Sequence, residues 1–181
     1  IVSTCTYGTV DVNVLPTFDL EYIFLQIRSK SVGEKVKIKV LCPDDKETYT
    51  EHEVDLTKVN VQVDDDHTNT IEVNDKIKMI MTYPTINSVD PTADSKSMKT
   101  DKLFEIIGNT IYQIIDGETV HQAKDYTQKE LRDFIDSLDS GVFVRLQKFF
   151  STMPRLAHEI TVTNPKTNVE SKVTLQGLAD F

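Results

Sequence analysis

The spacing of hydrophobic residues changes along the chain and predicts where helices and strands lie. Residues 17–31 predict a helix with an apolar stripe at helical spacing. That stripe consists of Leu20, Ile23, Phe24 and Ile27. Phe18, Tyr22 and Leu25 are apolar as well but lie off the stripe. A helix that is apolar around most of its circumference is usually buried on two sides. The pattern leaves open whether the second side packs within the chain or against another molecule.

Alternation with a period of two predicts strands on both sides of this helix. Residues 9–14 alternate before it. After it, residues 34–40 and 48–55 predict a hairpin, with lysines on the outer face of one strand and glutamates on the other. Further strands are expected at residues 60–63, 70–73 and 77–83.

The second half of the chain shows helical spacing. Residues 88–100 have no apolar period and predict an exposed linker. The next apolar face predicts a helix that ends at residues 116–117; it consists of Leu103, Ile106, Ile107, Ile111, Ile114 and Ile115. Thr127 and Glu130 match a capping box at the start of another helix, and Pro154 ends a third.

Strands, then helices, then strands again predict an α+β fold. The expected organisation is a β-rich N-terminal half with one leading helix, a three-helix segment and a C-terminal β-hairpin. In residues, it consists of a β-rich domain at 1–87 with the helix at 17–31, a linker at 88–100, a helical segment at 101–153, and a hairpin and tail at 154–181.

Charge is distributed unevenly over the 181 residues. The formal net charge is −9 at pH 7, and residues 44–75 hold eleven acidic side chains against two lysines, whereas the rest of the chain is balanced. The predicted hairpin lets part of this charge meet the basic residues just before it. Asp64, Asp65 and Asp66 remain as an acidic patch, which either orients a basic partner or is a solvated loop.

Residues that carry enzymatic or metal chemistry form no recognised set. The two cysteines and four histidines lack the spacing of a zinc site. The acidic triple lacks the glycine and the terminal acid of a calcium loop. Serine and glycine motifs of hydrolases and phosphate-binding loops are missing. The acidic segment beside the lysine strand would repel nucleic acid. We therefore expect no catalytic residue, cofactor, metal or nucleic-acid partner, and no apolar run is long enough to span a membrane.

One long motif resembles a known family. Residues 15–34 read LPTFDLEYIFLQIRSKSVGE and resemble the signature of the T4-like myophage baseplate hub proteins, which include the hub assembly protein. Residues 81–84, 163–165 and 175–181 are also similar to that family. The resemblance implies a non-enzymatic structural or assembly protein of a contractile tail, assembled in the host cytoplasm and located in the virion baseplate. A hub chaperone absent from the mature virion and a tail-associated cell-wall hydrolase are the alternatives.

The resemblance also implies partners among the other hub and tail proteins, including tube or tape-measure components, and an oligomer within the baseplate. We expect Phe18, Tyr22 and Leu25 to face a hub partner, because the stripe would occupy the side that packs on the β half. In the alternative, Tyr22 and Leu25 pack against the C-terminal helices. The candidate interface residues are Phe18, Tyr22, Leu25, Arg28, Lys30, Asp64, Asp65 and Asp66.

Overall fold

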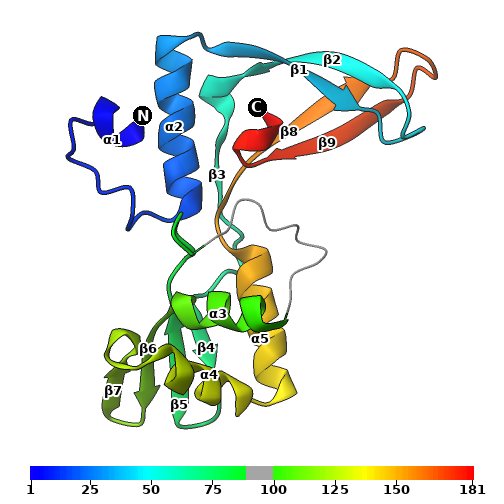
Figure 1. Cartoon of the computed structure of the whole chain (residues 1–181). Coiled ribbons are helices and arrows are strands. Elements are labelled where there is room, and N and C mark those ends of the chain that lie inside the picture. The colour runs from blue at the N-terminus through cyan, green and yellow to red at the C-terminus, as the bar shows by residue number, and fades with distance from the viewer. Residues whose placement is uncertain (89–99) are drawn as a thin grey trace. The chain divides into compact units, whose positions relative to one another are not determined.

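The computed structural model describes residues 1–88 and 100–181 and has an α+β fold (Figure 1). Apart from its two end residues, the linker expected at 88–100 lies outside the described residues. The chain divides into two compact units. Unit 1 comprises Ile1–Gln62 and Pro154–Phe181, and unit 2 comprises Val63–Met153.

Unit 1 contains two antiparallel sheets beside one long helix. Its helices are α1 (Val2–Cys5), α2 (Thr17–Ser31) and two short 3-10 helices (Leu56–Lys58 and Leu178–Asp180). Its strands are β1 (Lys35–Leu41), β2 (Tyr49–Asp55), β3 (Asn60–Gln62), β8 (Arg155–Thr163) and β9 (Glu170–Gln176). β1 pairs with β2, and the second sheet has the order β3-β8-β9. Both hairpins expected from the sequence are thus confirmed.

The core of unit 1 lies where α2 meets the strands. The buried cluster there includes Leu25, Val54, Leu56, Val59 and Leu156. The two hairpins lie side by side (Figure 1), and a hydrogen-bond network joins their tips. In it the buried amide of Asn164 donates to both carboxylate oxygens of Asp44, at 2.9 and 3.0 Å, and the Thr167 hydroxyl donates to the same group.

Residues 9–14 form turns, so the strand expected there is wrong. Asp11 Oδ1 accepts hydrogen bonds from the backbone nitrogen and the side-chain amide of Asn13, both at 3.0 Å. Short polar side chains that form hydrogen bonds to nearby backbone groups compete with the backbone hydrogen bonds between strands of a sheet. No neighbouring strand in the described part of the chain pairs with this segment. Alternation alone therefore did not make a strand.

Unit 2 is a four-stranded antiparallel sheet packed with helices. Its elements are β4 (Thr70–Glu72), β5 (Ile77–Met81), α3 (Thr100–Thr110), β6 (Ile111–Asp116), β7 (Thr119–Gln122), a 3-10 helix (Ala123–Asp125), α4 (Gln128–Asp136) and α5 (Ser140–Thr152). The strand order is β4-β5-β6-β7. Met79, Ile135, Val142, Leu146 and Phe149 are among the buried residues of its core. The strands expected around residues 70–73 and 77–83 therefore share a sheet with β6 and β7 rather than with the N-terminal hairpin.

The helix expected to run to residue 116 ends at Thr110, which is a correction. The buried Thr110 hydroxyl donates to the carbonyl oxygens of Ile106 and Ile107, at 3.1 and 2.8 Å. The next residues, Ile111–Asp116, pair with β5 on one side and β7 on the other. Isoleucines fit a pleated strand at least as well as a helix. Pairing with β5 and β7 on its two sides makes this segment a strand.

The capping box expected at Thr127 is confirmed. The Thr127 hydroxyl accepts from the backbone nitrogen of Glu130, and the Glu130 carboxylate accepts in return from the backbone nitrogen of Thr127. Two otherwise unpaired donors at the start of α4 are satisfied in this way.

Candidate interaction surface

The inner face of α2 packs in the core of unit 1 and includes residues that the sequence placed at an interface. Leu25 has no exposed surface, and Phe18 is buried as well. Tyr22 packs against the unit 1 core cluster, which Leu25 belongs to. Leu25 and Tyr22 therefore face the core that α2 forms with the strands of unit 1, and Phe18 is buried. The helix has two apolar faces, and the sequence does not say which one the strands cover.

The two basic residues of the predicted interface differ in their surroundings. The Arg28 side chain donates to the backbone oxygen of Phe181, at 3.4 Å, and so holds the C-terminal segment near α2. Lys30 is exposed and forms an ion pair with Glu34, at 2.7 Å. An exposed pair of this kind contributes well under about 1 kcal/mol. Arg28 is thus part of the fold, whereas Lys30 remains at the surface.

The opposite side of α2 carries the apolar stripe. Successive residues turn by about 100° around a helix axis, so Ile23 and Ile27 lie roughly opposite Leu25. We call this the outer α2 surface; it consists of Leu20, Ile23, Phe24 and Ile27, all partly exposed. None of these four residues is among the side chains that pack on the unit 1 core cluster. Four large apolar side chains thus remain partly in water on one helix face.

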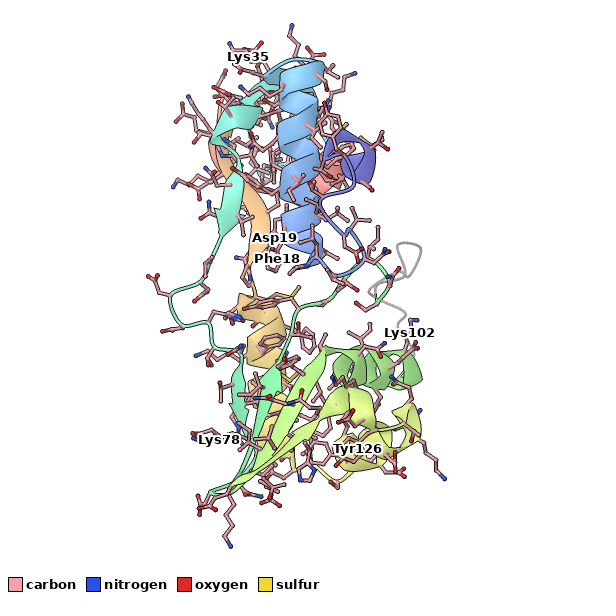
Figure 2. All side chains as sticks on the ribbon, turned by 90° about the vertical axis from the view of Figure 1, so that its left-hand side faces the viewer. Phe18, Asp19, Lys35, Lys78, Lys102 and Tyr126 are labelled. Carbon is pink, nitrogen blue, oxygen red and sulfur yellow. The ribbon has the colours of Figure 1, made fainter. Side chains whose placement is uncertain are left out.

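Residues 1–16 border the outer α2 surface. α1 packs against α2, and Figures 1 and 2 show it on the side of α2 away from β3. Figure 2 labels Phe18, at the end of α2 where this segment joins it. Tyr7 is 94% exposed, and Ile1 and Val14 are also largely exposed. Exposed apolar residues next to an apolar helix face enlarge the surface available to a partner.

The acidic patch lies in unit 2, whereas α2 lies in unit 1. Asp64, Asp65 and Asp66 are all exposed, and Asp64 Oδ1 accepts from the backbone nitrogen of Asp66, at 3.0 Å. This is a local turn in which the side chain replaces a backbone acceptor. The structure therefore presents the patch and the α2 residues as two separate features of the chain.

His67, which follows the acidic patch, contacts other residues of unit 2 through its ring and both ring nitrogens. Its two ring nitrogens lie 2.9 Å from the Thr152 and Tyr83 hydroxyls, and its ring contacts Phe149. Because Thr152 already donates to the carbonyl of Lys148, its oxygen accepts from His67 Nδ1. Burial lowers the pKa of the imidazole below its usual value of 6.5. The neutral ring is therefore the form that fits this site.

The hairpin in unit 1 pairs its charges across the ladder as expected. Lys37 stands opposite Glu53, and Lys39 stands opposite Glu51. The Lys35 amine donates to Glu53, at 2.7 Å, which raises the pKa of Lys35 and lowers that of Glu53. Both groups of this pair are well exposed, so the contact orders the surface more than it stabilises the fold.

The described ranges contain no candidate metal site and no candidate membrane-spanning helix. No group of three or more His, Cys, Asp or Glu side chains is placed there to hold a metal ion. Among the same residues, no helix is both long enough and apolar enough to cross a bilayer.

Comparisons with known proteins give one match. Residues 1–181 match the family described as T4 bacteriophage base plate protein. No curated protein and no solved structure matches the chain. Because the family match covers every residue, the chain belongs to the T4 bacteriophage base plate protein family.

Proposed function

We propose that this protein is a non-enzymatic structural or assembly protein of the baseplate hub of a contractile phage tail. Its family makes it a phage baseplate structural protein of the virion. The hub assignment rests on the resemblance of residues 15–34 to hub proteins. This motif builds α2, which has one face in the core and an opposite face whose apolar side chains are only partly exposed, next to α1.

The outer α2 surface is the observation that carries the proposal. Removing apolar surface from water contributes about 25 cal/mol per Å2, so each 100 Å2 that a partner covers adds about 2.5 kcal/mol. Phe24 supplies an aromatic ring, and the two isoleucines supply rigid branched side chains. Large apolar anchors of this kind dominate the energetics of protein interfaces. We therefore place a contact with another hub or tail protein, such as a tube or tape-measure component, on this face.

The contact is tested by supplying variants in trans to a phage that lacks the gene. Replacing Ile23 and Phe24 with serine removes the anchors from the outer α2 surface and is expected to abolish plaque formation. A melting curve by circular dichroism should show that the double variant still folds, because both side chains lie outside the core cluster. Val144, which is 65% exposed on α5, provides a matched control, and Val144→Ser should form plaques normally. Normal plaque numbers with a folded double variant would contradict the proposal.

Mass spectrometry of purified virions separates the two fates of a hub protein. A permanent component is found at a fixed copy number relative to the other baseplate proteins. An assembly chaperone is found in infected cells but not in virions. We expect the protein in the virion, in agreement with its family, and its absence there would assign it to assembly alone.

A further inference from the structure

A cavity of about 300 Å3 opens in unit 2 between α4 and strands β5, β6 and β7. Its apolar lining consists of Ile77, Ile114, Leu131 and Phe134. Cavities that bind whole cofactors or drug-sized ligands begin at about this volume and extend to several times more. The space therefore fits a single long side chain better than a cofactor.

Two carboxylates line the same cavity. Asp116 ends β6 opposite Ile77 in the ladder, and Glu130 lies in the first turn of α4. Within the described part of the chain, the Asp116 carboxylate and Glu130 Oε1 have no hydrogen-bond or ion-pair partner. Nor does any lysine or arginine from the described residues line the cavity. We call this cavity the acid-rimmed pocket, because its negative charge meets no cation there.

The polar residues around the pocket are held in place by short-range contacts. Glu130 Oε2 accepts from the backbone nitrogen and the hydroxyl of Thr127, both at 2.8 Å. These bonds lower the pKa of Glu130, so the carboxylate is ionised at neutral pH. His121 Nδ1 lies 2.6 Å from the hydroxyl of Tyr126, which Figure 2 labels. The site is thus partly preorganised, with aromatic rings beside one carboxylate that is held in place, Glu130, and a second that is exposed, Asp116.

We propose that the acid-rimmed pocket binds an arginine side chain presented by a partner protein. The methylene stem of arginine covers the apolar lining while its guanidinium reaches Asp116 and Glu130. Phe134 and Tyr126 supply ring faces and edges for the flat cation. Lysine fits less well, because its ammonium is a strongly hydrated point charge that does not stack.

This inference does not depend on the outer α2 surface. The acid-rimmed pocket belongs to unit 2 and α2 belongs to unit 1, so either contact can fail while the other holds. The two surfaces also differ in chemistry, because one takes an apolar partner face and the other takes a cation. Raised salt should therefore weaken the second contact far more than the first.

The test is a titration of the full chain followed by 1H–15N NMR, with N-acetyl-arginine amide as the probe. Saturable shifts are expected for backbone amides of β6, β7 and α4 at millimolar concentrations. N-acetyl-norleucine amide, which has the apolar stem without the charge, should give no saturable shifts there. N-acetyl-lysine amide should bind more weakly than the arginine amide.

Variants that remove only the charge make the test specific. The double variant Asp116→Asn, Glu130→Gln is expected to raise the Kd about tenfold or more. Glutamine at the third position of α4 still completes a capping box, so the helix start is preserved. Asp133→Asn, an exposed change on α4 outside the pocket, is the control and should leave the Kd unchanged. Shifts scattered over the surface, equal binding of norleucine amide, or full affinity in the double variant would overturn the proposal.

Discussion

Replacing Leu25 with alanine tests which face of α2 holds unit 1 together. The side chain has no exposed surface and packs in the cluster that contains Val59 and Leu156. The substitution removes three carbon groups, which at about 0.8 kcal/mol each amount to about 2.4 kcal/mol of lost burial. The cavity that remains adds to this loss, because surrounding strands relax only in part. We expect the free energy of unfolding to fall by about 3 to 4 kcal/mol.

The matched control is the same substitution on the other face of the same helix. Leu20 is partly exposed on the outer α2 surface and does not pack on the core cluster, so Leu20→Ala should cost about 1 kcal/mol or less. Urea unfolding followed by far-ultraviolet circular dichroism measures both values. If the two variants lose equal stability, or if Leu20→Ala loses more, the assignment of inner and outer faces is refuted.

Three further changes probe two buried polar groups, Asn164 and Ser29, and the partly buried His67. Asn164→Ala removes the two hydrogen bonds to Asp44 and should lower the free energy of unfolding by about 2 kcal/mol in urea titrations. The hydrogen bond from Thr167 and, after it, those from Asn164 lower the pKa of Asp44, so the wild type should lose stability as the pH falls through that lowered pKa. The variant keeps the Thr167 bond and should lose somewhat less. His67 binds a proton less readily in the folded chain than in the unfolded one, so the free energy of unfolding should fall as the pH drops below about 6.5. His67→Gln should make the free energy of unfolding less dependent on pH in this range. Equal pH dependence of the variant and the wild type would contradict this prediction. Ser29→Ala should leave the melting temperature unchanged or raise it, because the buried Ser29 hydroxyl has no hydrogen-bond partner within the described residues; a clear decrease would show a bond that this structure lacks.

The sequence predicted α2 closely but not the direction of its faces. Its range, the hairpins that flank the core and the capping box of α4 all follow from local spacing, and the structure confirms them. Choosing between the Leu25 side and the stripe at Ile23 and Ile27 needs the position of β3 and β8. The position of these strands depends on contacts between residues far apart in the sequence, and local hydrophobic periodicity does not predict such contacts. Of the predicted interface residues on α2, Phe18 and Leu25 are therefore buried and Tyr22 packs on the core cluster.

The boundary between α3 and β6 was missed for a related reason. Ile107 and Ile111 are buried and lie four residues apart, as on a helix, yet the chain changes to a strand between them. The density of isoleucine after Thr110 was the available signal for a strand. The acid-rimmed pocket depends on this strand, because Asp116 and Ile114 are placed by its pairing with β5 and β7. If these residues formed a helix, this pairing would not place Asp116 and Ile114 at the pocket.

Unit 1 is built from two pieces of chain, with all of unit 2 between them. During synthesis, β3 leaves the ribosome long before β8, and the pairing of Asn60 with Ala157 closes a loop of about a hundred residues. Until then Leu25 lacks Leu156 and Ile160, and only the part of the core cluster that precedes β8, which includes Val54, Leu56 and Val59, covers the inner face of α2. The newly made protein thus passes through a period in which the inner face of α2 is only partly covered. The core of unit 1 is therefore complete only after β8 and β9 have been synthesised.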